Sequence, residues 1–198
     1  MEHYYSKNPQ STFVTETWKY SFNDIHFTFT SGSGVFSKGR IDFGSELLIK
    51  SFQMPSSEGN ILDFGCGYGA IGIILAKTYK NRKFSMIDIN ERAIALTKKN
   101  IEQNNVNNAQ VIHSDGIVSL VNQEKFAAIV MNPPIRTGKA KIYELFAQGK
   151  QMLLFDGEMW IVIQKKQGAA SAQKYLSEIF SDVAIVNRKK GYIILRCK

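Results

Sequence analysis

The feature of the sequence that most constrains its fold is a regular alternation of apolar runs and amphipathic stretches from Asn60 onward. Strand-like runs are bounded by turn residues, and the stretches between them repeat apolar residues at helical spacing. The predicted strands cover residues 61–64, 84–87, 109–113, 126–131 and 158–164, with two more in 182–197 that are joined by a turn at Lys190-Gly191. The predicted helices cover 70–79, 90–105, 139–153 and 169–180. This pattern favours an α/β fold with an open, seven-stranded, mostly parallel Rossmann-like sheet, helices on both faces and an antiparallel C-terminal hairpin.

The first 58 residues follow a different pattern and are predicted to form an N-terminal extension, 1–58, to a main domain at 59–198, the two making one compact unit. Apolar and polar residues alternate on both sides of Asn23-Asp24, which predicts a β-hairpin. We expect one face to hold Trp18, Tyr20 and Phe22, and another to hold Ile25, Phe27 and Phe29. A glycine-rich loop, "SGSGVFSKGR", follows, and then a helix in "FGSELLIKSFQ" with Asp42 or Ser45 as its cap.

Polar side chains fall at or just after the carboxyl ends of four predicted strands: Asp63, Asp88, Asp115 and Asn132. Ligands of open α/β sheets bind outside these strand ends. The sequence therefore predicts one ligand site at this edge of the sheet.

The loop "LDFGCGYGAIG" joins the first strand of this sheet to its first helix. Gly65, Gly67 and Ala70 satisfy the dinucleotide fingerprint, with Asp88 about twenty residues further on, so a nicotinamide cofactor is one alternative. The loop also reads as G-x-G-x-G, through Gly69, with Asp63 two residues before the first glycine. A carboxylate there repels a pyrophosphate and suits a cationic ligand, such as the methionine ammonium of S-adenosylmethionine, directly or through water.

The other two acids have assignments of different strength. Asp88 can accept both ribose hydroxyls whichever cofactor is bound. Asp115, followed by Gly116, could place an acceptor near an adenine amino group, although taken alone it favours a helix cap.

Asn132-Pro133-Pro134 follows the apolar run 126–131. Proline fixes its own φ and has no N–H, so this segment is a stiff turn, and by itself the motif fits a mere end of a strand equally well. It also fits chemistry on an exocyclic amine, whose lone pair is delocalised into a ring. Asn132 Oδ1 and the Pro133 carbonyl could each accept one amine hydrogen, which would favour a pyramidal nitrogen in a preorganised site. This chemistry needs no metal.

Charge and aromatic residues indicate a partner. The 198 residues include 25 Lys and Arg against 17 Asp and Glu, a net charge of +8 that fits RNA or DNA and fits a merely basic protein equally well. Arg136, Lys139 and Lys141 are predicted to contact phosphates, whereas Arg188-Lys189-Lys190 favours a solvated turn. Phe36 is our candidate for stacking on a base, with Tyr68 second, and Ile135 supplies apolar contact.

In this order, Asp63-x-Gly65-x-Gly67-x-Gly69, Asp88, Asp115 and Asn132-Pro133-Pro134 resemble the class I S-adenosylmethionine-dependent methyltransferases over about residues 60–198. "GVFSKGRIDFGSELLI" and "NPPIRTGK" resemble the small-subunit ribosomal RNA guanine-N2 methyltransferase family, the RsmC type, and its short members in particular. Larger members carry a second, degenerate N-terminal domain, which we expect this chain to lack. Many amino-methyltransferases have an aromatic residue where this chain has Ile135.

The resemblance implies methyl transfer from S-adenosylmethionine to an exocyclic amine of RNA, guanine N2 of small-subunit ribosomal RNA first of all, with ribosomal RNA or a ribosomal particle as partner. Adenine N6 or a protein glutamine amide are alternatives within the same chemistry. A nicotinamide-dependent oxidoreductase and a non-catalytic RNA-binding module are alternatives outside it. The polar N-terminus and two distant cysteines, Cys66 and Cys197, predict a cytoplasmic protein with no membrane span and no disulfide framework.

Overall fold

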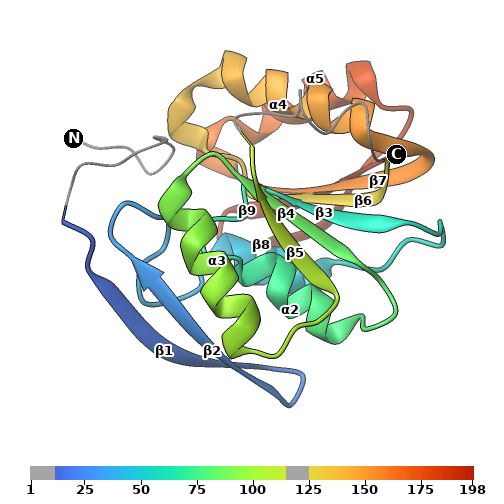
Figure 1. Ribbon diagram of the computed structural model, residues 1–198. Coiled ribbons are helices and arrows are strands. Elements are labelled where there is room, and N and C mark those ends of the chain that lie inside the picture. Colours follow the sequence, from blue (N-terminus) through green and yellow to red (C-terminus); the bar gives the residue numbers. More distant parts are fainter. Residues whose placement is uncertain (1–11, 115–124) are drawn as a thin grey trace. The chain divides into compact units, whose positions relative to one another are not determined.

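The computed structural model describes residues 12–114 and 125–198 (Figure 1). The strands are β1 (Thr15–Phe22), β2 (Ile25–Gly32), β3 (Asn60–Phe64), β4 (Phe84–Asp88), β5 (Ala109–His113), β6 (Phe126–Met131), β7 (Leu153–Gln164), β8 (Val183–Lys189) and β9 (Tyr192–Cys197). The helices are α1 (Phe43–Ser51), α2 (Ala70–Thr78), α3 (Glu91–Gln103), α4 (Lys139–Met152) and α5 (Ala169–Ile179), with 3-10 turns η2 (Ile135–Thr137) and η3 (Lys165–Gln167). Most predicted boundaries agree with these to within two residues, but β7 begins well before its predicted start at Glu158. No helix within the described ranges is long and apolar enough to cross a membrane.

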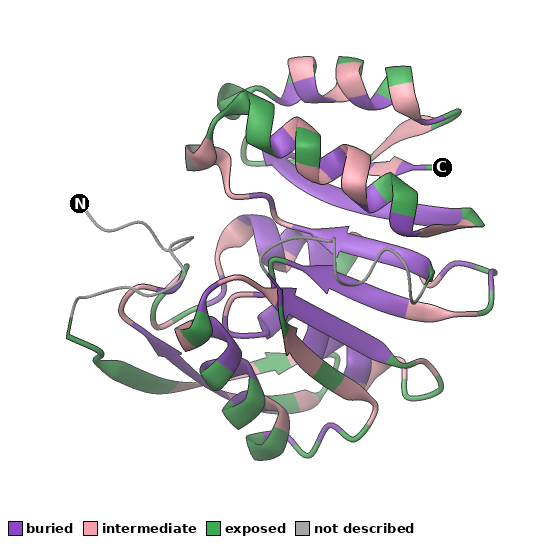
Figure 2. Cartoon of the chain, turned by 45° about the horizontal axis from the view of Figure 1, so that its top comes forward, coloured by how far each residue is buried: buried purple, intermediate pink, exposed green. Residues whose placement is uncertain are grey.

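Seven strands form a mostly parallel sheet in the order β5-β4-β3-β6-β7-β9-β8. Parallel pairing joins β4 to β5 and β6 to β7, whereas β9 runs antiparallel to both β7 and β8. The predicted fold class is confirmed, including the N-terminal hairpin. The strands carry much of the buried surface, and every residue of β6 is buried (Figure 2).

The chain divides into two compact units. Unit 1 comprises residues 1–42 and 62–116, and unit 2 comprises 43–61 and 117–198. The domain boundary expected from the sequence, between 1–58 and 59–198, stays a prediction.

In unit 1, β1 and β2 form the predicted hairpin, with Asn23 and Asp24 both at positive φ in its turn. The prediction that the two aromatic sets occupy different faces is wrong. Trp18 pairs with Phe29 and Tyr20 with Phe27, and directly paired residues of antiparallel strands point to the same side. The turn length therefore places both sets on one face of the hairpin, which sequence alternation within each strand does not reveal.

Two asparagines attach this hairpin to α3. Asn100 Oδ1 accepts from Thr30 N at 2.7 Å, and Asn100 Nδ2 donates to Thr30 O at 2.9 Å. Asn104 makes the same pair of bonds to the backbone of Thr28, at 2.9 and 2.8 Å. Each amide thus satisfies a backbone donor and acceptor of β2 as a neighbouring strand would.

In unit 2, helices cover both faces of the strands. A β-carbon at Gly149 of α4 would lie 2.4 Å from Met159 Cε, so this helix packs closely on β7. Phe52, just after α1, contacts the ring of Trp160 with centroids 5.3 Å apart. Met159 and Trp160 are consecutive strand residues and face opposite sides, so α4 and α1 lie on opposite faces of β7.

Candidate active site

The glycine loop of unit 1 leads from β3 into α2, and its three predicted glycines all have positive φ. The φ values are 76° at Gly65, 59° at Gly67 and 89° at Gly69, a region that other residues rarely adopt. A β-carbon at Gly65 would meet nothing within 4 Å, and at Gly67 only Val35 Cγ1 at 3.9 Å. At Gly69 it would lie 2.8 Å from Thr97 Cγ2. The first two glycines therefore leave their surface open to a ligand, whereas the third permits the helix to pack.

Asp88, at the carboxyl end of β4, is hydrogen-bonded to the loop. Its Oδ2 accepts from Gly67 N at 2.8 Å and its Oδ1 accepts from Asn90 N at 2.9 Å. Burial raises the pKa of this carboxyl, and the two backbone donors oppose that rise. Each carboxylate oxygen has a second lone pair, so Asp88 can hold the loop and still accept hydroxyl groups from a ribose.

Asp63, on β3, is 1% exposed and lies beneath the loop. Its Oδ2 accepts from Gly72 N at 2.8 Å, within the first turn of α2. Desolvation, with a smaller contribution from the charge of Asp88, raises its pKa from 3.8 to about 7, against the lowering effect of the Gly72 bond. Among the described residues, no donor reaches its Oδ1. An unsatisfied buried acceptor of this kind fits a ligand that brings a donor, directly or through water.

Gly72 is a site residue that the sequence reasoning missed. A β-carbon there would lie 2.4 Å from Met86 Sδ and 3.0 Å from Asp63 Oδ2. The residue must therefore be glycine for α2 to approach the carboxyl of Asp63. The signal was present, since Gly72 extends the glycine run to "GCGYGAIG".

Residues of α3 support the loop from behind. Thr97 Oγ1 donates to Gly67 O at 2.8 Å, and Asn100 Nδ2 donates to Tyr68 O at 2.8 Å. Asn90 caps α3 as predicted by accepting from Arg92 N at 2.9 Å. Its Nδ2 also donates to Gly34 O at 2.8 Å, a bond to the glycine-rich loop that the sequence did not predict.

In unit 2, Asn132 directly follows the buried strand β6. Its Nδ2 donates to the hydroxyl of Ser45 on α1 at 2.9 Å, and Ser45 is only 6% exposed. This bond fixes the amide plane and turns Oδ1 away from Ser45. Ser45 lies inside α1, so its predicted role as the helix cap is wrong. The helix begins at Phe43 because the chain is already helical two residues before Ser45.

The two prolines differ in their carbonyl groups. The Pro134 carbonyl accepts from both Thr137 N at 2.9 Å and Thr137 Oγ1 at 2.8 Å. These bonds hold the turn η2 that Ile135 begins. The Pro133 carbonyl therefore remains the candidate acceptor beside Asn132, as the sequence reasoning assigned it.

The predicted substrate residues are arranged as follows. In unit 2, Ile135 is half-buried in η2, and the position of Arg136 in η2 is described without its side chain. Lys139 begins α4, with its ammonium 5.2 Å from the ring centre of Tyr143. Lys141 forms an ion pair with Glu144 at 3.0 Å, so part of its charge is already neutralised.

Of the two aromatic candidates in unit 1, only one is exposed. Phe36 has 42% of its surface exposed, in the glycine-rich loop. Tyr68 is 4% exposed and donates its hydroxyl to Arg40 O at 3.0 Å, with its ring edge against Trp18. Packing of this kind leaves Tyr68 no face for a base. Asp115, the candidate adenine contact, lies outside the described residues.

The residues of unit 1 fit S-adenosylmethionine. Asp88 suits the ribose hydroxyls, the exposed surface of Gly65 and Gly67 suits close approach of a ligand to the backbone, and the orphaned Asp63 Oδ1 suits a cationic end. An α/β sheet with this loop, and with an amide followed by two prolines at the end of another strand, defines the class of S-adenosylmethionine-dependent methyltransferases. The family model of the methyltransferase small domain matches residues 26–196, and the chain belongs to that family. The predicted enzyme class and cofactor are confirmed.

Similar proteins have been found in several bacteria. "Uncharacterized protein YbxB" of Bacillus subtilis (strain 168) is 49% identical over 197 residues, which cover 100% of this chain and 98% of that protein. Ribosomal RNA small subunit methyltransferase C of Vibrio parahaemolyticus is 32% identical over 202 residues, covering 96% of this chain and 56% of that protein. The Aeromonas hydrophila protein of the same name is 34% identical over 139 residues, covering 68% and 39%. This chain thus spans about half the length of the methyltransferases C that it matches.

A solved structure shares the fold. The T. thermophilus 16S rRNA N2 G1207 methyltransferase (RsmC), in complex with AdoMet and guanosine, superposes with a TM-score of 0.82 at 23% identity. The match covers 96% of this chain and 52% of that chain.

Proposed function

We propose that this protein transfers the methyl group of S-adenosylmethionine to an exocyclic amine of a base in RNA, and that the base is a guanine of small-subunit ribosomal RNA modified at N2. The observation that carries the proposal is the fixed amide of Asn132 beside Pro133 at the end of β6. The names of the relatives supply the substrate class, since ribosomal RNA small subunit methyltransferase C is named for ribosomal RNA.

The residues of unit 1 hold the cofactor, which supplies a methyl group on a positively charged sulfur. Asp88 accepts the ribose hydroxyls, and the backbone of Gly65 and Gly67 lies against the ligand. Asp63 receives the ammonium end, directly or through one water, through its buried Oδ1. A cation there lowers the pKa of Asp63 because it stabilises the carboxylate.

Asn132 and Pro133 hold the target amine. Asn132 Oδ1 accepts one amine hydrogen and the Pro133 carbonyl accepts the other. Ser45 preorganises the first acceptor, and the fixed φ of proline preorganises the second. Two acceptors favour a pyramidal nitrogen, whose lone pair becomes available for the methyl group. The product is an ammonium that is acidic enough to lose its proton to water, so no strong base is needed.

The alternatives predict different results. Adenine N6 and a glutamine amide are planar nitrogens that the same acceptors could serve, and the target is distinguished by the substrate that becomes methylated. A non-catalytic RNA-binding module would bind RNA and transfer nothing. The family match supports a methyltransferase over a nicotinamide-dependent oxidoreductase.

The direct test is methyl transfer from labelled S-adenosylmethionine to ribosomal RNA from cells that lack this gene, followed by mass mapping of the modified nucleoside. In Asn132→Ala we expect near-normal melting and cofactor affinity, with transfer reduced roughly 10²–10³-fold, the usual effect of one preorganised transition-state hydrogen bond.

The chain offers a matched control for this variant. Asn187 also donates from Nδ2 to a serine of α1, Ser51 Oγ, at 2.9 Å. Asn187→Ala therefore removes the same kind of bond without a role in the reaction, and should leave the transfer rate unchanged. Equal rates for Asn132→Ala and Asn187→Ala would contradict the catalytic assignment.

A further inference from the structure

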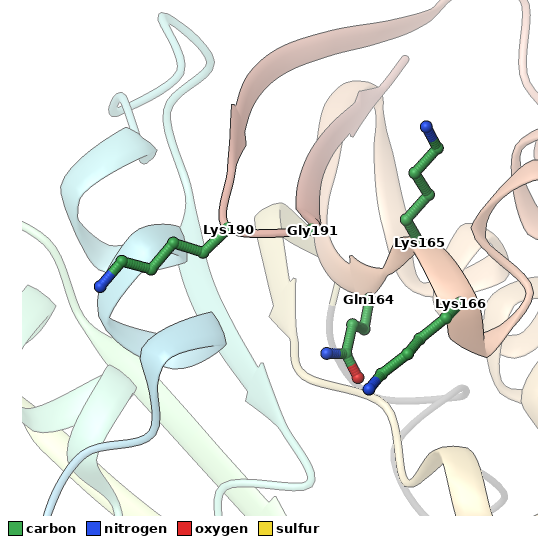
Figure 3. Close-up of a pocket in the computed structure, with 5 residues that line it drawn as sticks. All are labelled: Gln164, Lys165, Lys166, Lys190 and Gly191. Atoms are coloured by element: carbon green, nitrogen blue, oxygen red, sulfur yellow. The ribbon is translucent and has the colours of Figure 1, made fainter.

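A basic pocket lies in unit 2 and has no role in the proposed chemistry so far. It has a volume of about 370 Å³ and is lined by Gln164, Lys165, Lys166, Lys190 and Gly191. The side chains of Gln164 and Lys166 point to the same side of the pocket, whereas Lys165 and Lys190 extend from it in other directions (Figure 3). The backbone bond from Lys165 N to Gly191 O, at 2.6 Å, joins the two segments that form it.

The pocket lies at the same edge of the sheet as Asn132. In the parallel pair of β6 and β7, Met131 is opposite Ile161, so both strands end toward the same edge. Gln164, the last residue of β7, is opposite Tyr192 at the start of β9. The turn at Lys190-Gly191 therefore also lies at this edge, which is where ligands of α/β sheets bind.

Phe43 connects the pocket to the anchor of Asn132. The ammonium of Lys190 lies 5.1 Å from the ring centre of Phe43, and the Tyr192 ring lies 5.5 Å from it. Phe43 is the first residue of α1, two positions before Ser45. The segment that fixes the candidate catalytic amide thus also contacts a lysine of the pocket.

Charge is separated between the two edges of these strands. The pocket segments read "QKKQG" (164–168) and "RKKGY" (188–192), with five cations and no acid. At the opposite edge, Asp182 pairs with Arg196 at 3.3 Å and Glu158 with Lys198 at 3.7 Å. Within the described part of the chain, no carboxylate forms an ion pair with a lysine of the pocket. Cations that are not neutralised by the fold remain available for an anionic ligand.

Lys190 also occupies an unusual backbone position. Its φ is 47° and that of Gly191 is 77°, so both central residues of the hairpin turn are left-handed. Asn or Gly is preferred there, because a longer side chain is disfavoured at positive φ. A lysine at this position is not explained by the stability of the turn, and it suggests that the side chain is needed for a contact.

We propose that Lys165, Lys166 and Lys190 bind a backbone phosphate of the RNA strand whose base is held at Asn132. The inference rests on the proposed function and adds to it a second, sequence-independent contact to a neighbouring nucleotide. Lysine ammonium groups bind phosphate as point charges, and such contacts position a strand without reading its sequence. The solvated turn expected from the sequence at Arg188-Lys189-Lys190 thereby acquires a binding role for Lys190.

The test compares two variants that lose the same charge. The pocket variant is Lys165→Gln/Lys166→Gln/Lys190→Asn, in which asparagine retains the turn because it tolerates positive φ. The control variant is Lys80→Gln/Lys83→Gln/Lys99→Gln, which alters three exposed lysines of unit 1. Binding of an unmodified small-subunit ribosomal RNA transcript and of poly(U) is measured over a salt series, together with melting temperature and cofactor affinity.

For the pocket variant we expect affinity for both RNAs to fall roughly tenfold and the salt slope to decrease by about 2, since each lost phosphate contact lowers it by about 1. The control should change less than about twofold by the same reasoning, and melting and cofactor affinity should match the wild type. In methyl transfer, KM for RNA should rise while kcat is unchanged. Equal binding by the two variants, with wild-type transfer intact, overturns this inference alone. Failure of the wild type to bind either RNA overturns it as well, and absence of methyl transfer to RNA by the wild type overturns the proposed function.

Discussion

The buried carboxyl of Asp63 gives a prediction that can be worked through in numbers. Its pKa in the folded protein is about 7 rather than 3.8, because burial disfavours the charged form more than the Gly72 N–H stabilises it. Between these two values the folded protein keeps a proton that the unfolded chain has released. The free energy of unfolding therefore falls as pH rises through this window. A pKa difference of about 3 corresponds to about 4 kcal/mol in total.

The variant Asp63→Asn removes the titration while retaining an acceptor for Gly72 N. Urea unfolding of the cofactor-free protein, measured at several values from pH 5 to pH 8, gives the stability of wild type minus that of the variant. We expect this difference to fall by about 3 kcal/mol across the range, since the part below pH 5 is not sampled. Any simultaneous release of Asp88 changes it in the same direction, because the two carboxyls repel each other.

Asp156→Asn is the control, because Asp156 is exposed and the same chemical change there should give a difference that is flat with pH. A flat difference for Asp63→Asn as well would refute the reasoning that Asp63 is held protonated by burial. Cofactor affinity offers a second readout. Asp63→Asn should weaken binding of S-adenosylmethionine, whose ammonium would lose a carboxylate partner, and unchanged affinity would remove Asp63 from the cofactor site.

Three further variants test the supports of the site. Ser45→Ala should lower kcat about tenfold with little change in KM for RNA, because a lost hydrogen bond of about 1 kcal/mol lets the Asn132 amide rotate; Ser51→Ala is its control, and a kcat equal to that control would contradict the role. Gly72→Ala should reduce the free energy of unfolding by about 1–3 kcal/mol through overpacking against Met86, and urea unfolding indistinguishable from wild type would show that α2 can shift. Asp88→Ala should weaken S-adenosylmethionine by on the order of 2–4 kcal/mol in calorimetry, and unchanged affinity would exclude Asp88 from ribose binding.

Local sequence was enough for the elements and for much of the cofactor loop. Strands and helices are signalled by spacing over a few residues, so β5 and β6 begin and end at the residues predicted. Glycine at positive φ is also a local property, and Gly65, Gly67 and Gly69 were found for that reason. Asn132 was found because it directly follows an apolar run.

Contacts between distant segments were not predictable in this way. Ser45 and Asn132 are 87 positions apart, and no local pattern pairs a helix serine with a particular strand-end amide. The faces of the hairpin were assigned wrongly because strand alternation gives no register across a turn. The burial that raises the pKa of Asp63 depends on the close approach of α2, which the contact between Gly72 and Met86 sets.

The basic pocket shows the same division between sequence and tertiary structure. The sequence by itself determined that Lys165-Lys166 follows a strand and that Lys190-Gly191 lies in a turn, because both depend on near neighbours. Only the tertiary structure decided that these two segments meet, because antiparallel pairing of β7 with β9 sets Gln164 opposite Tyr192. Strand register is a long-range property, fixed by which apolar faces are buried together, and here it converts two separate basic segments into one pocket.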